Sequence, residues 1–241
     1  MTSAGLEGAH IRSAGETLVG GLYRAAGESP RPAVLLLHGL PGHEKNLDLA
    51  IALRDRGFHT LYVHYRGSWG SSGTFSCANL VADAAAAFDW LAQREAVRSH
   101  GIAVVGFSLG GWTAMALAAQ RSVAAVVAIS PPVDSRHVPL PADLAAESAA
   151  ALRGTTAERL TDEWASLPPA TTFADALRSR PGLLVTGDHD PLFPPRHFAP
   201  LVQAIPSLRH VRFPRADHAF SDVRPGLRHV VARWLLDVFG P

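Results

Sequence analysis

One five-residue pattern, Gly-x-Ser-x-Gly at Gly106, Ser108 and Gly110, limits the folds open to this chain. The run 102–105 before it is apolar and mostly β-branched, which predicts a strand buried on both faces. The alanine-rich run 113–119 after it favours a helix. A strand turning sharply into a helix holds the serine in a strained conformation, and glycine on either side avoids clashes. A surface turn can match the pattern by chance, but this context favours a nucleophilic serine.

Strand-length apolar runs alternate with helical stretches through most of the chain. Buried strands are expected at 33–37, 58–65, 102–105, 123–129, 182–186 and 210–213, and helices at 47–56, 80–94, 196–205 and 227–239. Two antiparallel edge strands are expected within 9–25. The alternation predicts an α/β fold with a mainly parallel sheet of about eight strands and helices on both faces. Active groups should gather at the carboxyl ends of those strands.

The stretch 134–180 departs from this alternation. It has short helical segments at 143–152 and 157–164, paired prolines and no predicted strand. Because it is too long for a simple connection, we expect it to form a small cap inserted into a single domain spanning 1–241. An ordinary crossover helix with a longer loop is the alternative.

A nucleophilic serine needs a base to take its proton and a third group to orient that base. Asp190 and His218 each follow a predicted strand, on the sheet edge where Ser108 is expected. Their order along the chain, serine then acid then histidine, is the order expected on a sheet of this kind.

Together these motifs resemble the α/β-hydrolase superfamily, in the group of dienelactone-hydrolase-like and prolyl-oligopeptidase-like serine hydrolases. The resemblance covers about 33–239 and is carried by the segments 38–42, 106–111, 187–194 and 217–218. It implies the α/β-hydrolase fold and a catalytic triad of Ser108, Asp190 and His218. It does not specify a substrate.

The family pattern also separates the candidates for the acid. In that pattern a glycine is followed by two variable residues, an aspartate and a proline-containing loop, which selects Asp190 over Asp188. Without it, either aspartate is a turn former before Pro191. His218 lies in an Ala-Asp-His-Ala-Phe loop, and a surface role for it would leave Ser108 without a base. His38 resembles a structural histidine of the family.

An oxyanion hole needs two donors aimed at the developing negative charge. The N–H of Leu109, at the start of the helix after Ser108, is one candidate. The resemblance makes the N–H of Leu40 the other, since Pro41 has no N–H. The glycine-rich loop 66–73 lacks the lysine and spacing of a phosphate-binding loop, and its Trp69 either lines the pocket or packs.

The net charge, the cysteine count and the N-terminal sequence limit which binding partners and cellular compartments are expected. A net charge of +1 is too small to attract nucleic acid or an acidic membrane surface strongly. With one cysteine, Cys77, and no signal-peptide pattern at the N-terminus, we expect a cytoplasmic protein. We expect no cofactor and no metal, a small-molecule ester or amide substrate, and a monomer or homodimer.

The predicted activity is hydrolysis of a small to medium carboxylic ester through an acyl-enzyme intermediate. Aminopeptidase, amidase or acyltransferase activity on the same triad remains open, as does a ligand receptor on a hydrolase fold. Peptidase-like relatives usually carry a separate propeller domain. The chain leaves no room for one, which weakens the peptidase alternative without excluding it.

Overall fold

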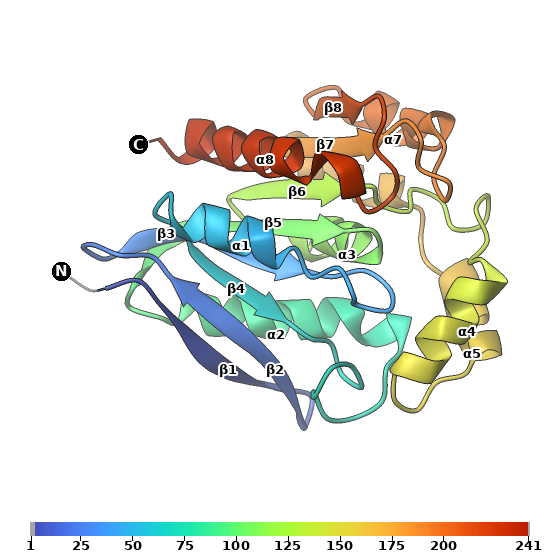
Figure 1. Ribbon diagram of the computed structural model, residues 1–241, viewed down its shortest axis with the longest axis horizontal. Coiled ribbons are helices and arrows are strands. Elements are labelled where there is room, and N and C mark those ends of the chain that lie inside the picture. The colour runs from blue at the N-terminus through green and yellow to red at the C-terminus, as the bar shows by residue number, and fades with distance from the viewer. Residues whose placement is uncertain (1–2, 241) are drawn as a thin grey trace.

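The computed structural model describes residues 3–240, so Met1 and Thr2, the start of the segment considered for a signal peptide, lie outside it. Its centre is an eight-stranded sheet in the order β1-β2-β4-β3-β5-β6-β7-β8 (Figure 1). The strands are β1 (Gly5–Ser13), β2 (Glu16–Arg24), β3 (Arg31–Leu37), β4 (His59–Val63), β5 (Val97–Phe107), β6 (Ala125–Ile129), β7 (Gly182–Gly187) and β8 (Arg209–Phe213). The six strands from β3 to β8 are parallel, while β1 and β2 pair antiparallel at one edge. The predicted α/β fold is confirmed.

Helices cover both faces of the sheet. The α-helices are α1 (Leu47–Arg54), α2 (Leu80–Ala92), α3 (Leu109–Ala118), α4 (Ala142–Ala151), α5 (Ala157–Ala165), α6 (Ala174–Arg178), α7 (Ala199–Ala204) and α8 (Arg224–Phe239). Short 3₁₀ turns occur at η1 (Cys77–Asn79), η2 (Ala170–Phe173), η3 (Pro195–Phe198) and η4 (Ser221–Val223). Within residues 3–240, no helix combines the length and apolar composition that a membrane span requires.

The central strand β5 shows why both faces are covered. Side chains alternate along a strand, so Val104 joins the apolar cluster beneath α2 and α3, while Val105 and Phe107 join the cluster beneath α1 and α8. All three are at most 5% exposed. A strand with no polar face needs a helix layer on each side, and its carboxyl end is the place where functional groups can reach solvent.

The segment between β6 and β7 holds α4, α5, η2 and α6, and α4 and α5 lie beyond the carboxyl ends of the parallel strands (Figure 1). One carboxylate fixes α5 to the rest of the molecule. Glu163 accepts hydrogen bonds from the Ser76 hydroxyl at 2.9 Å and from the Cys77 N–H at 2.7 Å. The indole N–H of Trp164 donates to the Val138 carbonyl at 2.9 Å, which ties α5 to the chain leaving β6.

Two expected elements differ most from the structure. Strand β5 begins at Val97, five residues before the apolar run, because Val97 pairs with Arg31 across a bulge in the ladder. The helix expected at 196–205 is divided into η3 and α7. Pro200 has no N–H to donate to the carbonyl four residues earlier, so a continuous α-helix loses a hydrogen bond there.

Candidate active site

Ser108 occupies the sharp turn between β5 and α3. Its backbone has φ 52° and ψ −124°, a conformation that residues with a Cβ rarely adopt. The turn is held from the neighbouring strand, because the Ser108 N–H donates to the Ile129 carbonyl at 2.8 Å. A Cβ on Gly106 would lie 2.0 Å from the Gly110 carbonyl oxygen, and one on Gly110 would lie 2.1 Å from that of Leu37. The backbones approach too closely for any residue but glycine at those two positions.

His218 and Asp190 form a hydrogen-bonded pair at the ends of β8 and β7. His218 Nδ1 lies 2.8 Å from Asp190 Oδ2, and the Asp190 side chain is fully buried. The other carboxylate oxygen, Oδ1, accepts from the N–H groups of Leu192 at 2.8 Å and Phe193 at 3.0 Å. Asp190 is therefore held on both oxygens, and it orients the imidazole so that Nε2 is the ring nitrogen free for other chemistry.

Two aromatic rings place the imidazole of His218 beside the serine turn. Its ring centroid is 5.0 Å from that of Phe107, the residue before Ser108, and 5.4 Å from that of Phe193. Among the described residues, no hydrogen bond joins the Ser108 hydroxyl to His218. Such contacts are commonly loose before substrate binds and tighten in the reacting complex.

The loop after β3 lies directly against the serine. A Cβ on Gly39 would be 2.7 Å from the Ser108 Cβ and 3.3 Å from its Oγ. Leu40 follows Gly39, and Leu109 is the first residue of α3. Neither the Leu40 N–H nor the Leu109 N–H has an acceptor among residues 3–240. Both donors are thus free for a ligand, and the Leu109 group is one that helix geometry leaves unpaired.

Trp69 packs on the same loop and does not line the cavity above Ser108. Its indole N–H donates to the Pro41 carbonyl at 2.8 Å, and the Lys45 ammonium lies 4.1 Å from its ring centroid. His43 contacts the Trp69 ring edge-on and reaches Glu147 of α4 at 2.9 Å. The loop is therefore braced by the 66–73 segment on one side and by α4 on the other.

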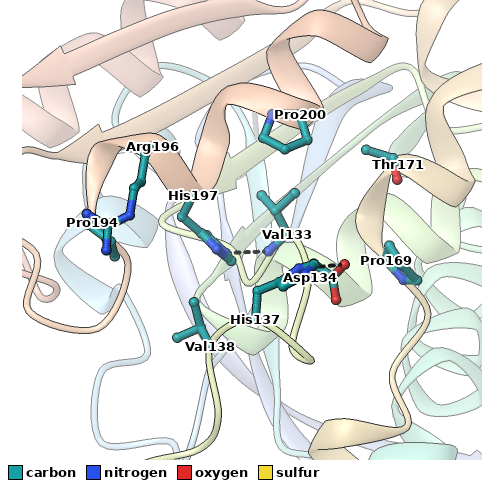
Figure 2. A pocket seen from close by; sticks show the side chains of 10 residues that line it. All are labelled: Val133, Asp134, His137, Val138, Pro169, Thr171, Pro194, Arg196, His197 and Pro200. Atoms are coloured by element: carbon teal, nitrogen blue, oxygen red, sulfur yellow. Dashed lines mark hydrogen bonds and ion pairs between the residues drawn. The ribbon is translucent and has the colours of Figure 1, made fainter.

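His197 is a buried residue that the sequence did not distinguish from other structural histidines. Its Nε2 accepts the Val133 N–H at 2.7 Å, in the lining of the pocket of about 440 Å³ drawn in Figure 2. Its ring stacks on Phe193, with centroids 4.9 Å apart and planes 15° apart. Because Phe193 also contacts His218, His197 connects the chain leaving β6 with the loop that carries Asp190. Nothing in the spacing of the sequence signals this contact.

The cavity above Ser108 is apolar and almost closed. Its volume is about 10 Å³, room for no more than about one water molecule. Apart from Ser108, only apolar residues line it: Leu40, Val138, Pro139, Leu140, Pro141, Leu144, Trp164, Leu192 and Phe193. Six of these nine belong to the segment between β6 and β7. Within the described part of the chain, no group of three or more His, Cys, Asp or Glu side chains is placed to hold a metal ion.

The sequence of residues 46–241 matches the model of the prolyl oligopeptidase family. The chain belongs to this family. It is thereby an α/β hydrolase, as the motifs at Ser108 and Asp190 predicted, and the prediction of the superfamily is confirmed.

One relative matches part of the sequence, and two solved structures share the fold. An uncharacterized protein of Rickettsia prowazekii (strain Madrid E), RP471, is 35% identical over 130 residues, or 51% of this chain and 54% of that relative. The chain thus matches about half of that relative's length. Est1E from Butyrivibrio proteoclasticus, in a structure with ferulic acid bound, has a TM-score of 0.81 at 19% identity, covering 97% of this chain and all of that one. The Pyrococcus furiosus esterase Pf2001 has a TM-score of 0.76 at 19% identity, covering 97% and 91%.

Three buried histidines of this prolyl oligopeptidase family member make its stability depend on pH. Burial lowers the pKa of His38 to about 4, of His64 to about 3 and of His197 to about 4, from an ordinary value of 6.5. The folded protein keeps these rings neutral, while the unfolded chain protonates them near pH 6.5. The contribution of these histidines to the free energy of unfolding is therefore fully present above pH 6.5. It is lost as the pH falls towards 4, by at most about 1.4 kcal/mol per pH unit for each histidine.

The variant His197→Gln tests this, because a glutamine oxygen can still accept the Val133 N–H but takes up no proton. We expect the fall in free energy of unfolding between pH 7 and pH 5, measured by urea denaturation, to be smaller in this variant. His10→Gln, on the exposed side of β1, is the control and should leave that fall unchanged. Equal pH dependence in His197→Gln and the unaltered protein would contradict the assignment.

Proposed function

We propose that this chain is a serine hydrolase that cleaves a carboxylic ester through a covalent acyl-enzyme. The observation that carries the proposal is the strained turn at Ser108 beside the paired His218 and Asp190. A serine at such a turn, with an oriented imidazole next to it, is the arrangement that makes a hydroxyl nucleophilic at neutral pH.

In the proposed mechanism, His218 Nε2 takes the proton as Ser108 Oγ attacks the ester carbonyl. The carbonyl oxygen becomes negatively charged in the tetrahedral intermediate, and the Leu40 and Leu109 N–H groups donate to it. His218 returns the proton to the leaving alcohol as the ester C–O bond breaks. Water, deprotonated by His218, then attacks the acyl-enzyme and releases the acid with Ser108 restored. Asp190 keeps the imidazole in the required tautomer and stabilises its positive charge.

We also propose that 134–180 forms a cap over the site and selects for uncharged acyl groups. The cap supplies most of the wall above Ser108, and no charged side chain lines that cavity. Burying an unpaired charge there would be costly, whereas an alkyl or aryl group gains from leaving water. Since the cavity holds about one water molecule as it stands, cap residues must separate before a substrate enters.

Two comparisons bear on the substrate in different directions. Of the structures with matching folds, Pf2001 is described as an esterase and Est1E has ferulic acid bound, which together support an ester. The family match favours a second candidate, cleavage of an aminoacyl amide or peptide, because the family is that of prolyl oligopeptidase. The same groups would serve, with an amine as the leaving group in place of an alcohol.

A fluorophosphonate probe, followed by mass spectrometry of the modified peptide, tests the proposal directly. We expect labelling at Ser108, and faster cleavage of p-nitrophenyl esters than of aminoacyl p-nitroanilides. Faster cleavage of the anilides would establish the second candidate. Product transfer to an added alcohol in place of water would identify an acyltransferase. Absence of both labelling and turnover would contradict a hydrolase and favour a receptor on this fold.

A further inference from the structure

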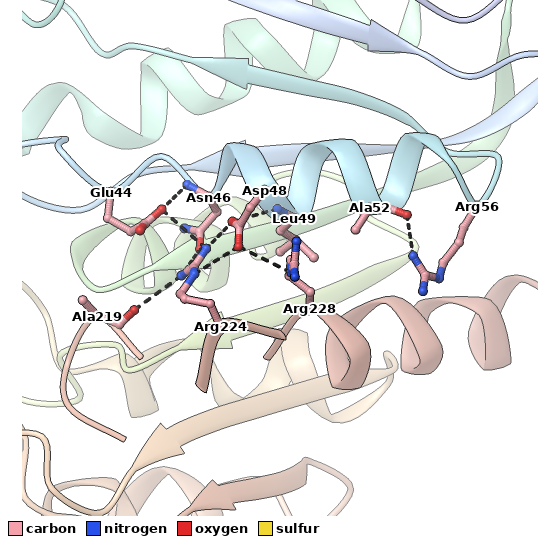
Figure 3. A network of polar contacts seen from close by, with 9 residues as sticks. All are labelled: Glu44, Asn46, Asp48, Leu49, Ala52, Arg56, Ala219, Arg224 and Arg228. Atoms are coloured by element: carbon pink, nitrogen blue, oxygen red, sulfur yellow. Dashed lines mark hydrogen bonds and ion pairs between the residues drawn. The ribbon is translucent and has the colours of Figure 1, made fainter. Parts of the chain in front are cut away.

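Arg224, the first residue of α8, joins segments that lie far apart in the sequence (Figure 3). Its two terminal nitrogens, Nη1 and Nη2, each donate to Asn46 Oδ1 at 3.1 Å, and Nε donates to Asp48 Oδ2 at 3.1 Å. Nη2 also pairs with Asp48 Oδ1 and lies 3.6 Å from Glu44 Oε1. In addition, Nη1 donates to the Ala219 carbonyl at 3.4 Å. One planar guanidinium thus contacts four residues.

Three of the four contacted residues, Glu44, Asn46 and Ala219, lie in the two loops that bring the proposed chemistry together. Asn46 ends the loop that starts at His38 and carries Leu40, and Asp48 lies in the first turn of α1. Ala219 is bonded directly to His218. Arg224 therefore bridges the loop of one oxyanion donor to the loop of the base.

Helix stability does not account for an arginine at this position. A cation at a helix N-terminus is repelled by the positive end of the helix dipole, so Arg224 is unfavourable for α8 itself. Its side chain is only 17% exposed, and Asn46, its partner, is 3% exposed. Asn46 also has a left-handed backbone, with φ 57°. The arginine breaks a local rule at the start of α8, and the side chain of Asn46 bonds to it instead of capping α1, a combination expected of residues held for function.

The loop around His218 packs beneath α1 and α8 through the fully buried Phe220, and its Ala216 carbonyl accepts the His189 N–H at 3.0 Å. It closes on itself through Asp217, which accepts from the Ser221 N–H at 2.8 Å and the Ser221 hydroxyl at 2.7 Å. Those bonds fix the shape of the turn but not its position relative to Leu40. Apolar packing of Phe220 is not directional, whereas the Arg224 contact with the Ala219 carbonyl adds a polar constraint that is shared with Asn46.

We propose that Arg224 is a positioning residue that holds the His218 loop in register with the Leu40 loop. It touches neither the substrate nor the reacting atoms. The inference rests on the proposed serine hydrolase function, since it concerns the placement of that base and that oxyanion donor. A displacement of about 1 Å between such groups lowers the rate by up to about 100-fold.

Arg228, one turn further along α8, provides a matched control. Its Nε lies 3.6 Å from Asp48 Oδ2, so it links α8 to α1 as Arg224 does, but it has no contact with Ala219 or Asn46. Replacing Arg228 tests the effect of losing an ion pair between α8 and α1 alone. Replacing Arg224 removes both an ion pair with Asp48 of α1 and the contact with Ala219 in the loop of His218.

The experiment compares Arg224→Lys, Arg224→Gln and Arg228→Gln with the unaltered protein, using a p-nitrophenyl ester and the fluorophosphonate probe. We expect kcat and the rate of Ser108 phosphonylation to fall together by about 10- to 100-fold in Arg224→Gln, with KM little changed. Arg224→Lys keeps the positive charge but not the planar guanidinium, so its kcat and phosphonylation rate should lie between those of the unaltered protein and those of Arg224→Gln. Added guanidinium at millimolar concentration should partly restore Arg224→Gln. Arg228→Gln should retain nearly full activity.

A readout that needs no activity accompanies the kinetics. Hydrogen–deuterium exchange should become faster at the Phe220 and Ser221 amides in Arg224→Gln, but not in Arg228→Gln, because only the former frees Ala219. Equal losses of activity in the two glutamine variants, or a loss confined to KM, would overturn the inference while leaving the hydrolase intact. If the unaltered protein shows neither labelling nor turnover, the proposed function fails first. Unchanged exchange in Arg224→Gln would then show separately that the loop is not held by Arg224.

Discussion

Replacing Ser108 by alanine is expected to lower kcat for ester hydrolysis by about 10⁴- to 10⁶-fold. The change removes only Oγ, the atom that would form the bond to the acyl carbon. The methyl side chain of alanine cannot form a hydrogen bond that competes for His218, so His218 and Asp190 should stay paired. Residual turnover would come from the free Leu40 and Leu109 N–H groups acting on an ester attacked by water. Steady-state kinetics with a p-nitrophenyl ester, together with loss of fluorophosphonate labelling, measures the effect.

Ser130→Ala is the matched control for this variant. Ser130 is a fully buried serine at the end of the neighbouring strand β6, and its φ is also positive, at 41°. Its hydroxyl has no hydrogen-bond partner among the described residues, so its removal costs no contact. We expect Ser130→Ala to keep its activity within a few-fold of the unaltered protein. Labelling that persists in Ser108→Ala would show that another residue is the nucleophile.

The second large effect is expected for Asp190→Asn, with a fall in kcat of about 10⁴-fold. An asparagine side chain keeps the size but presents one N–H₂ group where the carboxylate presents an oxygen. Two backbone N–H groups already face Oδ1, so the amide oxygen would turn towards them and the NH₂ towards His218. The imidazole would then expose Nε2–H to Ser108 and could not accept its proton.

Asp188→Asn separates the two aspartates of the same loop. Asp188 Oδ1 accepts from Arg212 Nε at 2.9 Å, in an ion pair whose arginine is 55% exposed. Exposed pairs of this kind contribute about 0 to 1 kcal/mol, so kcat should change little and the melting temperature by a few degrees at most. A larger loss of kcat in Asp188→Asn than in Asp190→Asn, with both proteins folded, would reverse the assignment.

The apolar runs predicted the sheet well, because a strand buried on both faces leaves a compositional signal that needs no knowledge of its neighbours. Where a strand continues into polar residues, that signal ends. Residues 98–101 of β5, which include Arg98, Ser99 and His100, form the bulge between the pairs Arg31–Val97 and Ala33–Ile102, and only the pairing of Val97 with β3 extends the strand across them. The break between η3 and α7 could have been predicted from Pro200, whose missing N–H is a property of the sequence alone.

Some features of the candidate site could likewise be predicted from the sequence, and others could not. Ser108, Asp190 and His218 follow strands, so topology and motif order were enough to predict that they share one edge of the sheet. The prediction of their roles awaits the experiments above. Contacts such as those of His197 with Val133 and of Arg224 with Ala219 depend on where loops of irregular shape meet, and no periodicity marks them. The nearly closed cavity over Ser108 depends likewise on how α5 docks through Glu163.

The groups gathered at the edge of the sheet come from widely separated parts of the chain, at Leu40, Ser108, Asp190 and His218. The strained turn at Ser108 is held by the Ile129 carbonyl on β6, and Asp190 and His218 follow the last two strands. If the proposed triad operates, a newly synthesised chain acquires a reactive serine only when its C-terminal quarter has joined the sheet. Partly made or cleaved chains would then carry the complete Gly-x-Ser-x-Gly motif and yet remain chemically inert, so reactivity at Ser108 would report that strands β5 to β8 have assembled.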